Sequence, residues 1–334
     1  PMKRPKLETV ANKAGVSVAT VSQVLNGTGR ISEKTRAKVL NAASELQYVP
    51  DGRAASMRSG DLREIGMIIH FIANPFNAEV ISGVSDTLEA NDYLVSVLDS
   101  QDNADRQRRN LEAFIRSSRG GLLWVPAQNT PDDTIDLLRT HNIPTVTFLR
   151  EPYDTDFDHV GIENAQATQK ATEHLIELGH TQIAYFGGTD LNIVRQSRIN
   201  GYQAALEKHG LENSLIWDAQ NTKSAGLSAM LNLREKHPEI TAIVCNGDVV
   251  ALGACHALRR RNEIAGQDVS VIGFDDIQDA LTATPPLTTM TVKPYDLGVK
   301  LANTLLARIK APDAPITSTF MPAELTIRET TQAV

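Results

Sequence analysis

The sequence predicts an α/β protein in which a small, all-helical N-terminal unit precedes two lobes, each built on a parallel sheet. Three observations predict this architecture. Apolar residues recur at helical spacing over residues 1–48, Gly, Pro and Ser gather at 49–61, and strand-like and helix-like stretches alternate over 62–334. Such alternation is typical of a parallel sheet covered by helices on both faces. Two series of comparable length indicate two lobes with a cleft between them.

Composition excludes several classes of protein. With 41% hydrophobic and 22% charged residues among 334, the chain has ample core for two or three domains and is not a disordered chain. Cys245 and Cys255 are too few for a disulfide scaffold, which fits a reducing compartment. No stretch approaches the roughly 20 apolar residues of a membrane span, and the basic N-terminus has no apolar segment behind it. We therefore expect a cytoplasmic protein with no membrane partner.

Charge is divided unevenly along the chain. Residues 1–60 hold ten basic and four acidic residues, a net charge of +6, which leaves −13 for the remainder of a chain whose total is −7. A basic N-terminal segment on an acidic body indicates that only the first part contacts a polyanion. Chance fluctuation is the alternative, so the pattern within the segment has to decide.

That pattern predicts two short helices joined by a tight turn. Residues 7–14 have helical spacing, Gly15 accepts the positive φ that ends a helix, and Ser17 is suited to cap a second helix over 18–26. The outward face of this second helix carries small and polar side chains: Val18, Ala19, Ser22, Gln23 and Asn26. Such residues suit base edges and phosphates better than a core, so the pattern is that of a DNA-reading helix-turn-helix.

A third helix and a linker complete the N-terminal part. Ser32 is expected to cap the third helix, which closes a small core through Leu40, Ala43 and Leu46. Residues 53–58 have room for one and a half helical turns, which are marginal alone and would form when two copies pack in a minor groove. Met57 would then be the apolar wedge between base pairs. A plain flexible tether is the alternative interpretation.

The string AGVSVATVSQVLN, within residues 10–50, resembles the DNA-binding headpiece of the LacI/GalR family of bacterial repressors, and the similarity continues along the chain. The tetrapeptide GRIS at 29–32 resembles the branch of the family that controls the maltose regulon. The resemblance implies that Val18 and Ala19 read bases, that Ser17, Thr20 and Ser22 hold phosphates, and that Ala54 and Met57 form the hinge-helix pair. Gln23 stands where many members carry Arg, which changes the expected operator. The full predicted DNA-binding set is Ser17, Val18, Ala19, Thr20, Ser22, Gln23, Asn26, Arg30, Tyr48, Ala54 and Met57.

Polar residues follow the predicted strands of the body. Asp275 and Asp276 follow VSVIGF, Asn246 and Asp248 follow TAIVC, and Arg198 lies just inside a helix. Ligands of open parallel sheets bind at the carboxyl ends of the strands, and this assortment suits a polyhydroxylated or anionic ligand. Phe76, in the loop after IGMIIHF, could supply a stacking wall. Taken singly, each residue also has an ordinary interpretation as a cap, a turn former or a surface charge.

The resemblance implies that Arg198, Asn246 and Asp275 line an effector pocket between two lobes like those of periplasmic binding proteins, with Phe76 and Asn77 on the wall of the first lobe. Asn221 stands at an often aromatic position, which favours a sugar-like effector, and Asp248 is interpreted as a helix cap. The predicted domains are a headpiece (1–48), a linker with a hinge helix (49–61) and a two-lobe effector-binding and dimerisation domain (62–334). Lobe 1 would span about 62–161 and 293–319, and lobe 2 about 162–292 and 320–334. No leucine heptads end the chain, so a tetramer tethered by a coiled coil is not expected. A homodimer is expected, because one headpiece reads too few base pairs and two match a palindromic operator.

Nothing in the sequence indicates catalysis. It has no glycine-rich nucleotide motif, its histidines are scattered, and its two cysteines are ten positions apart, so we predict no enzyme, no cofactor and no metal site. The leading hypothesis is a transcriptional repressor controlled by a small-molecule effector. A solute-binding protein of the same build, which would have no use for residues 1–60, and a sugar-modifying enzyme are the alternatives.

Overall fold

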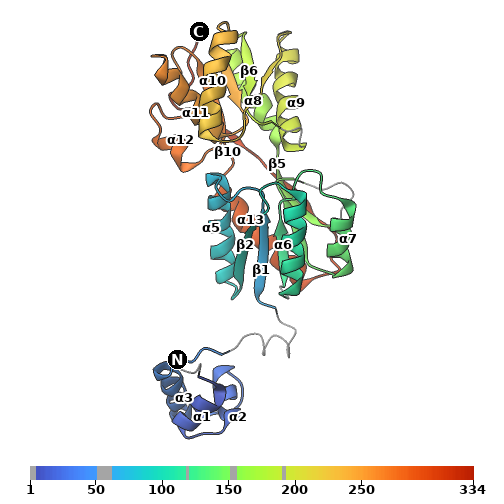
Figure 1. The fold of residues 1–334 in the computed structure, drawn as a ribbon, viewed down its shortest axis with the longest axis vertical. Helices are drawn as coiled ribbons and strands as arrows, with labels where there is room; N and C mark the ends of the chain where they lie inside the picture. Colours follow the sequence, from blue (N-terminus) through green and yellow to red (C-terminus); the bar gives the residue numbers. More distant parts are fainter. Residues whose placement is uncertain (1–4, 51–61, 118–119, 151–155, 190–192) are drawn as a thin grey trace. The chain divides into compact units, whose positions relative to one another are not determined.

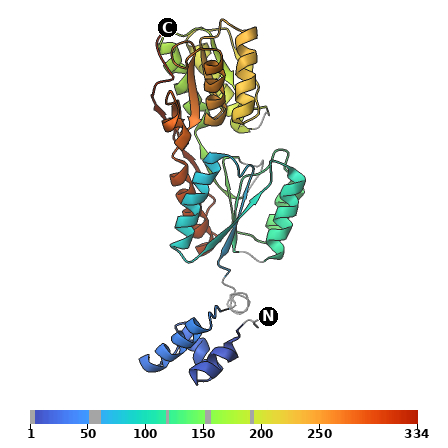
Figure 2. The ribbon, with the colours of Figure 1, turned by 60° about the vertical axis from the view of Figure 1, so that its left-hand side comes forward.

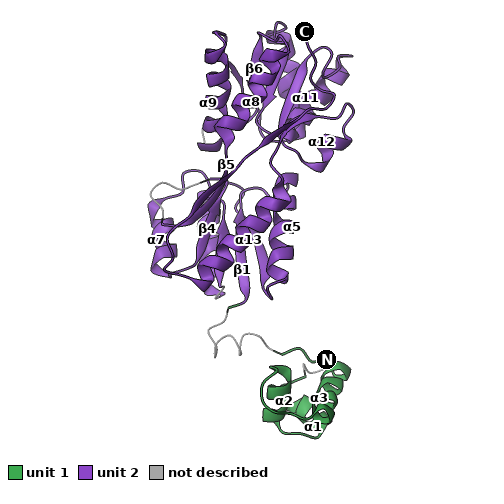
Figure 3. Ribbon diagram, turned by 180° about the vertical axis from the view of Figure 1, so that it is seen from behind, with its two compact units in different colours: residues 1–62 green, residues 63–334 purple. Residues whose placement is uncertain are grey.

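The computed structural model describes residues 5–50, 62–117, 120–150, 156–189 and 193–334. The chain divides into two compact units, residues 1–62 and 63–334, which are coloured separately in Figure 3. The α/β class predicted from the sequence is confirmed. No helix in the described part is both long and apolar enough to cross a membrane.

The first unit is a three-helix bundle of α1 (Leu7–Ala14), α2 (Val18–Leu25) and α3 (Glu33–Glu45). Gly15 ends α1 with φ +67°, and the Ser17 hydroxyl caps α2 by accepting a hydrogen bond from the Thr20 amide at 3.1 Å. The core is made by apolar residues of all three helices: Val10, Ala11, Val21, Val24, Val39, Ala42 and Ala43.

One prediction about this core is wrong. Leu40 is 48% exposed, and Val39 takes the buried position instead. The buried stripe of α3 runs through residues 39, 42, 43 and 46, so a residue one position later points about 100° away from the core.

The second unit contains two six-stranded sheets, one in each lobe (Figure 1). Lobe 1 has the strand order β11-β5-β4-β3-β1-β2, with all pairs parallel. Its strands are β1 (Glu64–Ile69), β2 (Leu94–Asp99), β3 (Gly121–Trp124), β4 (Thr145–Phe148), β5 (Asp158–Ile162) and β11 (Ser318–Met321). Its helices are α5 (Pro75–Glu89), α6 (Ala104–Arg116), α7 (Asp132–Thr140) and α13 (Pro294–Lys310).

Lobe 2 has the order β12-β10-β9-β8-β6-β7, and only β12 is antiparallel to its neighbour among these described pairs. Its strands are β6 (Ile183–Phe186), β7 (Leu215–Trp217), β8 (Ala242–Cys245), β9 (Ser270–Asp275), β10 (Thr288–Thr291) and β12 (Glu324–Thr326). Its helices are α8 (Asn164–Glu177), α9 (Ile193–Lys208), α10 (Lys223–Lys236), α11 (Asp248–Arg260) and α12 (Gln278–Thr282).

Helices cover both faces of the lobe 1 sheet (Figure 2). On one face α5 and α13 pack so closely that a Cβ on Gly83 would lie 2.1 Å from the Tyr295 carbonyl oxygen. On the other face α6 and α7 bury Phe114 and Leu138 against the strands. The chain passes between the lobes after β5, between β10 and α13, and again between β11 and β12.

Candidate functional site

The second helix of the first unit presents the side chains that the sequence predicts. Val18 is 41% exposed, and Ala19, Gln23 and Asn26 are also exposed, while Thr20 and Ser22 are half-buried. Thr20 and Ser22 are tied locally, because the Ser17 and Thr20 hydroxyls share a 2.9 Å hydrogen bond and Asn26 donates to the Ser22 hydroxyl at 3.3 Å. Apolar and polar groups therefore share one solvent-facing side of α2.

The other predicted residues of this unit lie around that helix. Arg30 is exposed in the loop between α2 and α3, and Tyr48 is half-buried against the three-helix core. The Gln23 side chain lies over the loop, with its Cδ atom 3.1 Å from where a Cβ on Gly29 would be. Ala54 and Met57 lie outside the described residues.

In lobe 2 the structure brings four predicted residues together at the carboxyl ends of the strands. Arg198, on α9, donates from Nε to Asn164 Oδ1 at 2.8 Å and from Nη1 to the Asn246 carbonyl, and its guanidinium stacks on the Phe274 ring at 3.7 Å. Asn246 Oδ1 accepts a hydrogen bond from the Tyr185 hydroxyl at 2.7 Å. The Asn164 side chain and the Asn246 backbone carbonyl thus hold Arg198 in one orientation.

Asn221 and Asp275 complete the group around Gly247. Asn221 Oδ1 and Asp275 Oδ2 lie 3.4 and 3.5 Å from the position that a Cβ on Gly247 would occupy, so glycine leaves this space open. Asp275 is only 7% exposed and has φ +119°, a conformation rare outside glycine. Burial raises the pKa of Asp275 to about 7, the nearby Arg198 charge lowers it and Glu79 raises it further.

Two other carboxylates of this edge are structural. Asp248 accepts hydrogen bonds from the Ile277 amide at 2.9 Å and the Thr289 hydroxyl at 2.6 Å, so its side chain joins the ends of neighbouring strands and is not the helix cap that the sequence suggested. Asp276 forms an ion pair with Arg328 at 2.7 Å. Both oxygens of each carboxylate thus accept hydrogen bonds from the protein, those of Asp276 from Arg328 and the Thr291 hydroxyl.

Lobe 1 holds the remaining two predicted residues differently from expectation. Phe76 is the second residue of α5 and not part of a loop, because Asn74 caps the helix by accepting from the Phe76 amide at 3.1 Å. Phe76 is buried, and Asn77 is fully buried with its Nδ2 donating to the Phe71 carbonyl at 2.6 Å. Their assignment to the effector wall stays a prediction, and contact with a ligand would require these side chains to become more exposed.

The carboxyl ends of the strands in lobe 1 face the carboxyl ends of the strands in lobe 2. Glu79, near the start of α5, accepts a hydrogen bond at 3.3 Å from the backbone amide of Gln278, which begins α12 in lobe 2. A cavity of about 400 Å³ lies between the lobes. It is lined by Leu149, His159, Ile162, Glu163, Asn164, Ala165, Gln166, Ile193, Val194, Ser197 and Phe320. Asn164 joins this cavity to Arg198.

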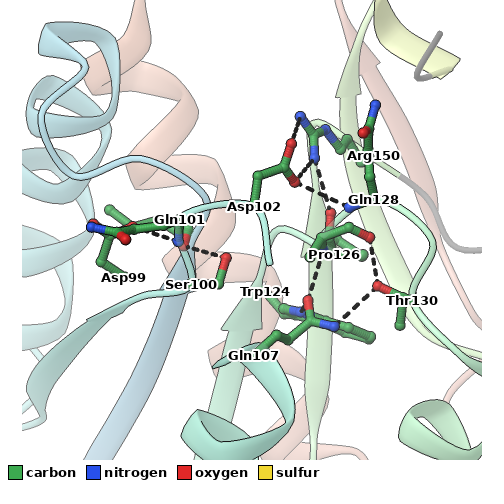
Figure 4. A network of polar contacts seen from close by, with 12 residues as sticks. Asp99, Ser100, Gln101, Asp102, Gln107, Trp124, Pro126, Gln128, Thr130 and Arg150 are labelled. Carbon is green, nitrogen blue, oxygen red and sulfur yellow. Dashed lines mark hydrogen bonds and ion pairs between the residues drawn. The ribbon is translucent and has the colours of Figure 1, made fainter. Parts of the chain in front are cut away.

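A polar network that was not predicted from the sequence lies at the corresponding edge of lobe 1 (Figure 4). Arg150, after β4, binds Asp102, after β2, with both terminal guanidinium nitrogens: Nη1 donates to Oδ1, and Nη2 donates to Oδ2 at 3.2 Å. The Gln128 amide donates to Asp102 Oδ1 at 3.0 Å. Both side chains are nearly buried, Arg150 12% and Asp102 11% exposed.

The network extends to two further residues. Gln107 Oε1 accepts from Trp124 Nε1 at 2.8 Å and the Ala127 amide at 2.6 Å, which fixes the loop after β3. His70, after β1, has a pKa lowered to about 3, first by burial and then by the Arg150 charge. The sequence does show a polar residue after each of these strands. No local pattern, however, indicates that Asp102 pairs with Arg150, which lies 48 positions further along the chain.

A helix-turn-helix unit followed by a two-lobe α/β receptor with polar strand ends defines a class of transcription regulators that combine a DNA-binding and a ligand-binding part. Comparison with known proteins agrees. The family described as periplasmic binding proteins and sugar binding domain of LacI family matches residues 63–329, and bacterial regulatory proteins of the lacI family match residues 6–51. The chain belongs to the LacI family of bacterial regulatory proteins.

Individual relatives cover nearly the whole chain. The maltose regulon regulatory protein MalI of Escherichia coli K12 is 31% identical, over 97% of this chain and 98% of that protein. The ribose operon repressor of the same organism is 32% identical, over 92% and 93%. A crystal structure of the lac repressor dimer bound to operator and the anti-inducer ONPF has a TM-score of 0.87 at 25% identity and covers 99% of this chain and 100% of that one.

Proposed function

We propose that this protein is a transcriptional repressor that binds a palindromic operator as a homodimer and is controlled by a carbohydrate-like effector between its lobes. The single observation that carries the proposal is the solvent-facing side of α2, where Val18, Ala19 and Gln23 stand unburied on a helix fixed by its cap. The ribose operon repressor and the lac repressor, bound to its operator as a dimer, support it. The protein would act on DNA in the cytoplasm and have no catalytic role.

The residue roles follow from the same reasoning. Val18 and Ala19 would contact bases, and Gln23 would bond adenine where an arginine would select guanine. Ser17, Thr20, Ser22, Asn26, Arg30 and Tyr48 would support phosphate contacts, and Ala54 and Met57 would form the hinge pair. We assign 1–48 to the headpiece, 49–61 to the linker and 62–334 to effector binding and dimerisation.

For the effector we infer that Arg198, Asn221, Asn246 and Asp275 form one wall. The carboxylate, amides and guanidinium offer acceptors and donors for paired hydroxyl groups. Because the chain crosses between the lobes three times, closure around a ligand would move lobe 1 and the linker attached to it. DNA affinity would then change by the coupling free energy, typically about 1–3 kcal/mol.

Fluorescence anisotropy with selected operator duplexes tests the DNA-binding surface. Val18→Glu places a carboxylate in the first turn of α2, where a negative charge is favourable for the helix. In the proposed complex the same carboxylate would lie next to the DNA and be repelled by its phosphates. We expect affinity for the selected duplex to fall at least 100-fold.

Ser44→Glu, an exposed position of α3, makes the same charge change in the same unit and should weaken binding less than about fivefold. Equal losses for the two variants would show that α2 does not read the DNA.

A further inference from the structure

The chemical class of the effector can be narrowed from the charges at the facing edges of the two lobes. Four buried or nearly buried arginines lie there. Three of them form ion pairs: Arg150 with Asp102, Arg195 with Asp218, and Arg328 with Asp276. The fourth, Arg198, forms no ion pair with a described residue, but burial lowers its pKa and the charge of Asp275 acts on it to raise that pKa. Glu79 adds a fifth carboxyl group without adding a cation. Among the described residues, these edges therefore have no excess of buried positive charge.

The hydrogen bonds of these arginines are also largely occupied. Arg150 holds Asp102 with both terminal nitrogens and also approaches the Pro126 carbonyl at 3.4 Å. Arg195 donates to Asp218 at 2.7 Å and to the Gly187 carbonyl at 3.1 Å. The basic residue Lys293 is exposed at the crossover into α13, and a cation in water holds an anion weakly.

A phosphate or carboxylate entering this space would meet an acidic environment. To use Arg150 it would have to displace Asp102 and leave that carboxylate buried without its partner, which is strongly unfavourable. Hydroxyl groups meet no such obstacle. The Asp275 carboxylate accepts no hydrogen bond from any described residue and is open to hydroxyl donors, with the Asn221 amide next to it.

We propose that the effector is an uncharged polyhydroxylated molecule, and that Asp102 excludes sugar phosphates and sugar acids by occupying Arg150. This inference rests on the proposed function, because it concerns the same cleft. It makes Asp102 a specificity-determining residue of lobe 1 that acts through Arg150.

Matched ligand pairs test the proposal on the full wild-type chain. Thermal shift and calorimetry would compare D-ribose with D-ribose 5-phosphate, and D-glucose with glucose 6-phosphate and gluconate, at equal ionic strength. We expect at least one neutral sugar to bind at least tenfold more tightly than its charged counterpart. A charged ligand that binds more tightly than its neutral parent would overturn the inference that the effector is uncharged. The proposed function as an effector-controlled repressor would still stand.

The variant Asp102→Asn tests the role of the ion pair separately. Freeing Arg150 should reduce the preference for the neutral sugar at least tenfold, and it should make inorganic phosphate stabilise a protein that phosphate does not stabilise in the wild type. Asp105→Asn removes an exposed carboxylate three residues away and should change neither result.

If inorganic phosphate stabilises the wild type as much as it stabilises the Asp102→Asn variant, the proposed role of Asp102 is overturned. The wild-type ligand pairs remain decisive if that variant does not fold. A chain that binds its operator but responds to neither member of any pair overturns the carbohydrate effector itself, and the inference with it.

Discussion

Replacing Asp275 with Asn should make the protein more stable and less responsive at once. Burial brings the pKa of Asp275 to about 7 from a usual value of 3.8. Because each pH unit corresponds to about 1.4 kcal/mol, keeping this carboxylate ionised at pH 8 costs the folded state on the order of 4 kcal/mol. An amide avoids this cost, and asparagine tolerates the positive φ of +119° better than alanine does.

The sign of the pH dependence follows from the raised pKa. The folded state keeps its proton between pH 3.8 and about 7 while the unfolded chain loses it, so wild-type stability falls as the pH rises through this range and then levels off. We expect Asp275→Asn to gain almost nothing at pH 4 and about 2–4 kcal/mol at pH 8, a rise in Tm of about 4–8 °C.

The same variant should lose the effector response. A ligand at 100 times its Kd stabilises the wild type by about 2.7 kcal/mol, and this increment should disappear while operator binding is kept. Scanning calorimetry from pH 4 to pH 8, with and without a sugar that binds the wild type, measures both effects, and Asp105→Asn is the control. A variant that is no more stable at pH 8, or that still responds to the sugar, would refute the reasoning.

Two further predictions concern the scaffold. His159 is 2% exposed with a pKa lowered to about 4 by burial, so the unfolded chain takes up a proton below pH 6.5 that the folded state refuses, and stability falls with the pH down to about 4. His159→Gln should reduce the slope of unfolding free energy against pH, measured by urea titrations, by about one proton. The control is His256→Gln, a replacement of an exposed histidine, which should leave the slope unchanged. Equal slopes in both variants would contradict the assignment. Gly83→Ala should cost about 1–3 kcal/mol or more by forcing α5 from α13, whereas the exposed Ser82→Ala should cost little, and calorimetry finding equal stabilities would contradict the close packing.

Sequence reasoning succeeded where the determinants are local. A capping hydroxyl, a glycine turn and helical spacing specify α1 and α2 within twenty residues, and these helices form as predicted. The choice of Leu40 over Val39 failed because both are apolar and the phase of α3 is set by its partners. Burial of Asn77 likewise depends on neighbours distant in sequence, which periodicity does not reveal.

At the cleft, the sequence predicts positions better than partners. Parallel strands place their carboxyl ends at one edge, which drew attention to Asn246 and Asp275 but equally to Asp248 and Asp276. The family resemblance, and not the strand pattern, selected Arg198, Asn246 and Asp275 for the effector site. The pair of Asp102 and Arg150 joins two separate loops of lobe 1, and either residue alone resembles an ordinary surface charge. Long-range ion pairs of this kind emerge only from the fold.

The cleft also holds a buried carboxylate in a backbone conformation rare outside glycine, and the proposed effector site would give this a functional reason. Asp275 combines burial, positive φ and a carboxylate without a hydrogen-bond donor among the described residues, while Glu79 of the opposite lobe raises its pKa further. Hydroxyl groups of a ligand would supply the missing donors to Asp275. The same binding event would act on Glu79 of lobe 1, which accepts a hydrogen bond from the Gln278 amide of lobe 2. These hydrogen bonds with a ligand are absent from the unliganded fold. Their formation with an effector would stabilise the closed arrangement of the lobes relative to the open one.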